Sequence, residues 1–214
     1  KNIFKYERLK TNKSVHNIQL LNGHLWITTN WNGTYCYRPE TDELRKLKPA
    51  NKHLDDMLVS SIAMKDEQIF LMATPYSILR IAFTGTDYIH DDLETTEMSF
   101  DNLTYDSFIN NRINKLYVDR KNKVVWLGTF GKGLLKSNMQ DNQVKRILLD
   151  KDIYNVNGVV QDAHGYVWLT TEYHGIWKSN SNQFSSATKF SLWENCKSKG
   201  RYTIYRDRSG SLWI

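Results

Sequence analysis

The chain has 214 residues, of which 40% are hydrophobic and 13% aromatic, with only 11 glycines and 3 prolines. This composition supports a hydrophobic core and excludes both a chain disordered over its whole length and a fibrous protein. The net charge of +6 is uneven, because positions 84–111 hold seven acids and no lysine or arginine, so that the other residues carry +13. No apolar run approaches the roughly 20 residues of a transmembrane helix.

A motif centred on tryptophan recurs along the chain. It reads LWITT at 25–29, VWLGT at 125–129, VWLTT at 167–171 and LWI at 212–214, with a weaker copy, IFLMA, at 69–73. The anchor aromatics are therefore Trp26, Phe70, Trp126, Trp168 and Trp213, at intervals of 44, 56, 42 and 45 residues. The long interval contains the acidic stretch, which we interpret as an insertion forming a solvated loop. A repeat of this length indicates a modular architecture.

The flanks of the anchors repeat in the same register. Seven residues after the anchor stand Gly33, Ser77, Gly133 and Gly175. Before it come apolar pairs three residues apart: Val15 and Ile18, Val59 and Ile62, Ile113 and Leu116, Val156 and Val159. A turn containing Asn or Asp separates each pair from its anchor. We expect structural roles: tryptophans between neighbouring sheets, glycines with positive φ, and Asp side chains that accept hydrogen bonds within their turns.

Each unit has the pattern of four short strands. In the third unit the strands are predicted at 113–119, 124–129, 133–137 and 144–149, because these segments are rich in β-forming residues and bounded by turns. Four strands in 40–45 residues is typical of a β-propeller blade. The sequence predicts an all-β propeller of four complete blades and part of a fifth, at about 10–50, 51–108, 109–150, 151–198 and 199–214. The best helical segment, 52–63, is interpreted as a connection between blades.

The repeat resembles a known family. The order of apolar pair, Asp-x-x-Gly, aliphatic-Trp-Ile/Leu-Gly-Thr and Gly-Leu, seen best at 124–134, 162–171 and 207–214, is similar to the two-component regulator propeller repeat. That resemblance implies the periplasmic sensor region of a hybrid two-component histidine kinase that controls transcription. It implies an oligosaccharide ligand, further blades or a second propeller, and a homodimer of the parent protein. It implies no cofactor and no enzymatic activity in this segment, which we expect to be a piece of a larger propeller.

The candidate ligand-binding residues lie in the loops after the second strand of each blade, which share one face of a propeller. Aromatic rings there stack on sugars, amides bond their hydroxyls, and Lys132 suits an acidic glycan. The nine candidates are Asn30, Trp31, Asn32, Tyr76, Phe130, Lys132, Glu172, Tyr173 and His174.

Other functions remain as alternatives. The chain could be a scaffold propeller that binds proteins or its own second copy, or a propeller lyase or hydrolase. Nucleic-acid binding ranks below these, because basic and aromatic residues do not interleave on one recognisable module. The GTFGKG segment at 128–133 has the wrong order for a phosphate-binding loop, and the six histidines show no metal spacing. Whether Cys36 and Cys196 form a disulfide stays open.

Overall fold

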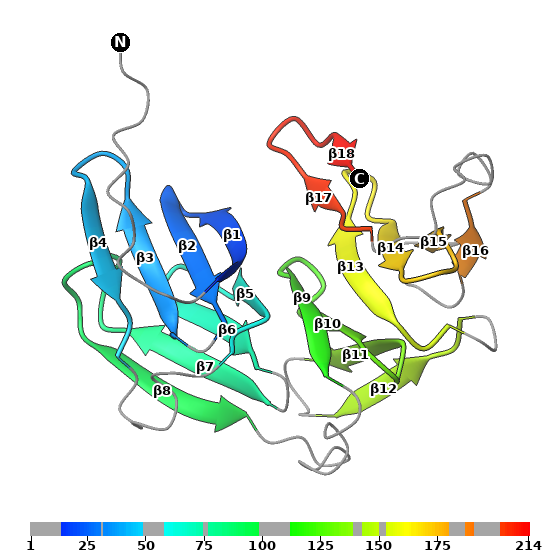
Figure 1. Ribbon diagram of the computed structural model, residues 1–214, viewed down its shortest axis with the longest axis horizontal. Coiled ribbons are helices and arrows are strands. Elements are labelled where there is room, and N and C mark those ends of the chain that lie inside the picture. The colour runs from blue at the N-terminus through cyan, green and yellow to red at the C-terminus, as the bar shows by residue number, and fades with distance from the viewer. Residues whose placement is uncertain are drawn as a thin grey trace.

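The computed structural model describes residues 14–30, 32–48, 58–74, 77–98, 112–138, 143–149, 153–179, 187–190 and 202–214. The described residues form strands and turns and contain no helix. Four antiparallel sheets of four strands and one pair of strands follow each other along an arc (Figure 1). The predicted all-β propeller architecture is confirmed.

The strands succeed one another in each sheet in chain order. Blade 1 contains β1 (Val15–Leu21), β2 (His24–Thr29), β3 (Thr34–Arg38) and β4 (Glu43–Lys46). Blade 2 contains β5 (Ser61–Met64), β6 (Ile69–Ala73), β7 (Ile78–Phe83) and β8 (Leu93–Met98). Blade 3 contains β9 (Ile113–Asp119), β10 (Val124–Thr129), β11 (Leu134–Asn138) and β12 (Val144–Ile147). Blade 4 contains β13 (Val156–Gln161), β14 (Val167–Thr171), β15 (Ile176–Ser179) and β16 (Ala187–Lys189). The last pair is β17 (Tyr205–Arg206) and β18 (Leu212–Trp213).

The first strand of each blade lies on the inside of the arc, and β4, β8, β12 and β16 lie on the outside (Figure 1). Contacts join β1 to β5, β5 to β9, β9 to β13 and β13 to β17. The inner strands of consecutive blades are therefore neighbours around a common centre.

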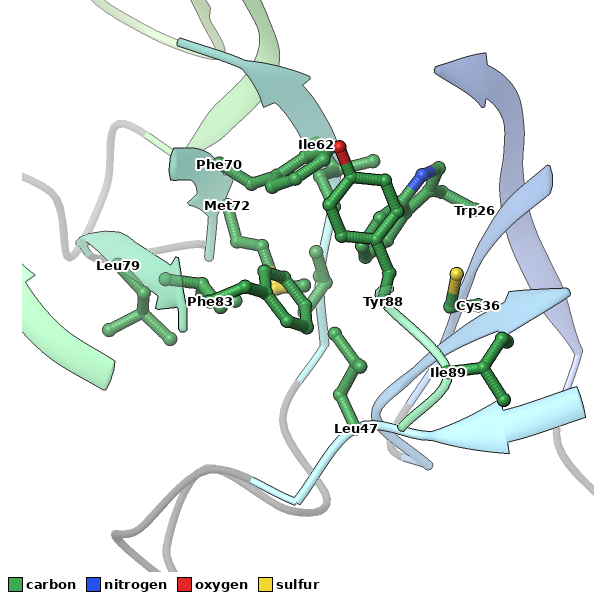
Figure 2. Packing of buried hydrophobic residues seen from close by; sticks show 12 residues of the cluster. Trp26, Cys36, Leu47, Ile62, Phe70, Met72, Leu79, Phe83, Tyr88 and Ile89 are labelled. Carbon is green, nitrogen blue, oxygen red and sulfur yellow. The ribbon is translucent and has the colours of Figure 1, made fainter. Parts of the chain in front are cut away.

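The hydrophobic core lies between blades, where the face of one sheet covers the face of the next. Trp26 of blade 1 is fully buried against Phe70 of blade 2, with ring centroids 4.4 Å apart, and Phe83 and Tyr88 surround the pair (Figure 2). Cys36, a free thiol beside them, is buried so fully that desolvation raises its pKa to about 12. The expected burial of the anchor between sheets is confirmed at this interface.

The register of blade 2 corrects one anchor. In blades 1, 3 and 4 the tryptophan pairs with the residue that follows the second member of the apolar pair, as Trp126 pairs with Tyr117, the residue after Leu116. In blade 2 that place belongs to Leu71, opposite Ala63, and not to Phe70. Leu71 packs toward blade 3, whereas Phe70 packs back toward blade 1. The weaker copy was therefore aligned one residue early.

A shorter loop explains the misalignment. Thr74 and Ser77 close the blade 2 loop through a backbone hydrogen bond from Thr74 N to Ser77 O, three residues apart. The corresponding bond in blade 3 joins Thr129 to Gly133, four residues apart. Because the blade 2 loop is one residue shorter, Phe70 and Ser77 are seven residues apart, as Trp126 and Gly133 are, although Leu71 is the structural equivalent of Trp126. Gly33, Gly133 and Gly175 have positive φ as expected, and Ser77 does not.

A β-bulge explains why the apolar pairs are three residues apart. Residues three apart on a regular strand point to opposite faces, yet Val156 and Val159 are both fully buried against blade 3. The pairing of β13 with β14 shifts register between Val156 and Gly158, which returns both valines to one face. Similar shifts occur in β1 and in the pairing of β9 with β10.

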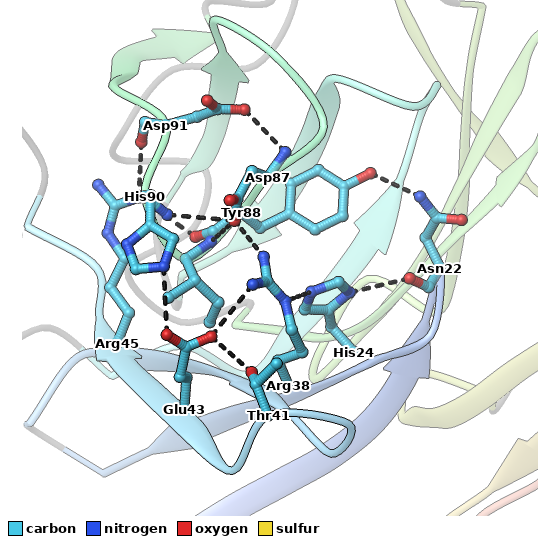
Figure 3. A network of polar contacts seen from close by, with 11 residues as sticks. Asn22, His24, Arg38, Thr41, Glu43, Arg45, Asp87, Tyr88, His90 and Asp91 are labelled. Atoms are coloured by element: carbon cyan, nitrogen blue, oxygen red, sulfur yellow. Dashed lines mark hydrogen bonds and ion pairs between the residues drawn. The ribbon is translucent and has the colours of Figure 1, made fainter.

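The acidic insertion is not the solvated loop that the sequence indicated. Tyr88 is fully buried, Ile89 is 8% exposed, and the acids at 94 and 97 belong to β8, the outer strand of blade 2. Arg38 of β3 pairs with Asp87 and, at 3.1 Å, with Glu43 (Figure 3). The ion pair with Asp87 and the buried tyrosine attach the insertion to blade 1. Its residues from 99 onward lie outside the described part.

The proposed connection at 52–63 is also wrong in its last part. Residues 61–63 belong to β5, and Ser60 donates a backbone hydrogen bond to Ala73 of β6. These residues form a strand because they pair with β6 and so become the inner edge of the blade 2 sheet. Residues 52–57 lie outside the described part of the chain.

Candidate functional site

The loops that follow β2, β6, β10 and β14 share one hydrogen bond, which is made by a threonine. A buried threonine at the end of each strand donates its hydroxyl to the carbonyl of the residue that closes the loop. In blades 3 and 4 these bonds, from Thr129 to Gly133 and from Thr171 to Gly175, are each 2.8 Å long. The threonine oxygen also accepts the backbone N–H of Lys132 or His174 at 3.1 Å. The conformation of the candidate loops is therefore held from inside the sheet.

Asn155, which sequence analysis missed, joins the loops of blades 3 and 4. Its side-chain oxygen accepts a hydrogen bond from Gly131 N at 3.0 Å, and its amide nitrogen donates to Glu172 Oε2 at 2.6 Å. Its backbone carbonyl accepts from Glu172 N at 3.2 Å, and a β-bridge connects it to Phe130. Two loops 42 residues apart thus become one surface, which we call the blade 3–4 loop surface.

The aromatic side chains on this surface are exposed. Phe130 is 40%, Tyr154 47% and Tyr173 68% accessible to solvent. The guanidinium of Arg146 lies 5.7 Å from the centre of the Tyr154 ring. Glu172 is only 7% exposed, held by its bond to Asn155. The surface combines flat apolar rings with hydrogen-bonding and basic groups, which is the chemistry that recognises polyhydroxylated ligands.

Of the other predicted site residues, the structure describes Asn30 and Asn32, which lie in the loop after β2. Asn30 donates its side-chain N–H to Ser14 Oγ at 2.7 Å, and Asn32 donates to the Tyr35 hydroxyl at 2.7 Å. Both bonds stay inside blade 1. Trp31 and Tyr76 lie outside the described residues. Of the predicted nine, the described structure brings together those of blades 3 and 4: Phe130, Lys132, Glu172, Tyr173 and His174.

Within the described residues, no group of three or more His, Cys, Asp or Glu side chains is arranged to hold a metal ion. A search of the same residues for a helix suited to crossing a membrane also finds none.

No model of a known protein family matches the chain, and no curated protein matches it. Solved structures do. The extracellular domain of the hybrid two-component system BT4673 of B. thetaiotaomicron matches with a TM-score of 0.68 and 19% identity, over 98% of this chain and 27% of that one. The corresponding domain of BT3049 from the same organism matches with a TM-score of 0.65 and 16% identity, over 97% and 27%. The chain has the same fold as the matched parts of these extracellular domains.

The comparison also shows the breadth of the fold. An ancestral GH74 enzyme matches with a TM-score of 0.64 and 14% identity, over 92% of this chain and 27% of the enzyme. The chain spans about a quarter of the length of these matched proteins. These structural matches agree with the resemblance of the repeat to the two-component regulator propeller family, and they establish the fold. Because one fold can serve many functions, the function has to be argued from the site.

Proposed function

We propose that this chain is part of the extracytoplasmic, periplasmic ligand-sensing region of a hybrid two-component receptor, and that it recognises an oligosaccharide. The observation that carries the proposal is the blade 3–4 loop surface, where Phe130, Tyr154 and Tyr173 are exposed around a hydrogen-bonded frame. Aromatic rings of this kind stack on the apolar faces of sugars. The matched propellers of two-component systems support the signalling role at the level of fold.

A glycan array followed by titration calorimetry on the full chain tests the proposal. We expect Tyr173→Ala to weaken the binding of a captured oligosaccharide by about fivefold, because an aromatic contact contributes on the order of 1 kcal/mol. Tyr205→Ala is the matched control, since Tyr205 is 52% exposed and belongs to β17 and not to these loops. Absence of any glycan binding, or equal loss in both variants, would contradict the proposal.

We propose further that the segment is not an enzyme. In the described part of the loops after β2, β6, β10 and β14, Glu172 is the only acid, and it is buried against Asn155. Glycoside hydrolysis uses two carboxyl groups facing the scissile bond. Incubation with the captured glycan should release no reducing ends, and turnover that is lost in Glu172→Gln would reverse this conclusion.

A scaffold role is the second candidate, favoured by the inner strand of blade 1. Val15 and Ile18 are 44% and 57% exposed, whereas the equivalent Val156 and Val159 of blade 4 are fully buried by the preceding blade. Such a face suits a further blade, a second propeller or a second copy of the protein. Sedimentation tests it: Ile18→Lys should abolish any self-association of the chain, while Leu148→Lys, at a residue 78% exposed on the outside, should not.

A further inference from the structure

Charge is divided unequally between the two halves of the arc. The described residues between 14 and 98, in blades 1 and 2, include 6 lysines and arginines and 10 acids, a net charge of −4. The described residues between 112 and 190, in blades 3 and 4, include 11 lysines and arginines and 3 acids, a net charge of +8. The blade 3–4 loop surface therefore belongs to the basic half of the chain, whose field attracts anions.

The three described acids of this basic half are bonded to other groups. Asp119 and Asp162 accept hydrogen bonds within the turns before β10 and β14. Glu172 is 7% exposed and accepts a hydrogen bond from Asn155 at 2.6 Å. Ion pairs that join two described residues lie in blades 1 and 2. Among the described residues, no carboxylate therefore forms an ion pair with a basic side chain of blades 3 and 4.

Basic residues accompany the exposed rings of the loop surface. Lys132 follows Phe130 in the same loop, and the threonine of that loop accepts the Lys132 backbone N–H at 3.1 Å. The backbone carbonyl of Arg112, an exposed residue, accepts a hydrogen bond from Phe130 N at 2.7 Å. Arg146 is also exposed, with its guanidinium 5.7 Å from the centre of the Tyr154 ring. A ligand that stacks on these rings would place its substituents near positive charge.

We infer that the blade 3–4 loop surface binds an anionic oligosaccharide, whose rings carry carboxylate or sulfate groups. This inference rests on the proposed recognition of an oligosaccharide and specifies its chemical class. The side chains of Phe130 and Tyr173 stack on the apolar faces of the sugar rings, while Lys132 and Arg146 pair with the anionic groups. A neutral oligosaccharide would use the rings alone and leave both cations without partners.

Titration calorimetry on the full chain compares tetragalacturonate with its methyl ester, which has the same rings but no charge. We expect tetragalacturonate to bind at least about tenfold more tightly, and added salt should reduce this preference. A sulfated galactose tetrasaccharide without carboxylates is the third probe, and the tighter of the two charged ligands identifies the anionic group. Equal affinity for the ester, or no binding of either charged ligand, overturns this inference. A neutral glycan that binds in the array would then leave the wider proposal intact.

Variants of two lysines locate the binding. Lys132→Glu should weaken the binding of the tighter charged ligand at least about tenfold and leave that of the ester nearly unchanged, whereas Lys132→Arg should retain both. Lys121→Glu is the matched control, because it changes the charge equally in the turn at the other end of β10. A strand of six residues spans about 17–20 Å, roughly two Debye lengths at 0.15 M salt. Neither lysine is buried, so both variants should fold, which unfolding curves verify. Equal losses in Lys132→Glu and Lys121→Glu, or none in either, refute the site.

Discussion

The indole Nε1 of Trp168 donates a hydrogen bond to Oδ2 of Asp162 at 2.8 Å. The other oxygen of the same carboxylate accepts the backbone N–H groups of His164 and Tyr166, both at 2.9 Å. One carboxylate therefore closes the turn before β14 and also fixes the tryptophan that follows it. A residue that sequence analysis assigned to its own turn also orients the blade anchor.

The hydrogen bond between the Asp carboxylate and the Trp indole depends on the number of residues that separate the two side chains. It recurs between Asp207 and Trp213, again six residues apart, with a distance of 2.7 Å. Asp119 and Trp126 are seven residues apart, and Asp119 Oδ2 instead accepts from Asn122 and Gln161. The extra residue in the blade 3 turn redirects the carboxylate toward the next blade.

Asp162→Asn should destabilise the protein by about 1–2 kcal/mol, because it replaces the oxygen that accepts from Trp168 with an amide N–H₂. Urea unfolding of the wild type and the variant measures the difference. In a Trp168→Phe background, which has no indole N–H, the same substitution should cost clearly less. Equal costs in the two backgrounds would show that the hydrogen bond contributes nothing.

The threonine that holds each loop gives a second prediction. Thr129→Val keeps the shape of a fully buried side chain but leaves Lys132 N without its partner and removes one of the two hydrogen bonds to Gly133 O, so we expect a loss of roughly 1–3 kcal/mol. Thr96→Val, at an exposed position on β8, is the matched control and should be close to neutral. Thermal or urea unfolding compares the two, and similar effects would argue against the role of the hydroxyl.

Two glycines with the same backbone conformation separate strain from crowding. Gly133 and Gly23 have φ of 70° and 76°. An alanine at either position would adopt the left-handed conformation, which lowers the stability of the folded state by about 1–2 kcal/mol. A Cβ at Gly133 would lie 2.8 Å from Ile153 O, whereas one at Gly23 meets nothing within 4 Å. Gly133→Ala should therefore be the more destabilising of the two in unfolding experiments, and the reverse order would contradict the packing of blade 3 on the loop before β13.

The carboxylate of Asp207 provides a prediction for pH. Hydrogen bonds from Ser209, then Trp213 and the turn backbone, lower its pKa to about 2. Since the folded state releases this proton more readily than the unfolded chain, the stabilisation is present above the ordinary pKa near 4 and is lost as pH falls toward 2. The chemical shift of the Trp213 indole proton should titrate with a midpoint near 2. A midpoint near 4 would show that the bonds do not persist in solution.

The loop surface shows what sequence can predict of a site. The periodic anchors placed Phe130, Lys132, Glu172, Tyr173 and His174 in equivalent loops, because position within a repeat fixes position on a blade. Nothing in the repeat marked Asn155, which lies in the connection before β13 and joins the two loops. Contacts between blades are non-local, and their partners have no fixed spacing.

The sequence by itself determined the blade, since the alternation of β-forming residues and turns within some 45 residues is a local signal. It predicted the strands of the third unit to within two residues at each end. Only the tertiary structure decided which face each residue turns to its neighbour. The register that assigns Leu71 rather than Phe70 to the anchor position, the bulge that turns Val156 and Val159 to one side, and the burial of Tyr88 from an acidic segment all arise from one sheet packing on the next. These features reduce the apolar surface exposed by whole blades. They depend on the neighbouring sheet, so they cannot be predicted from the sequence of one segment.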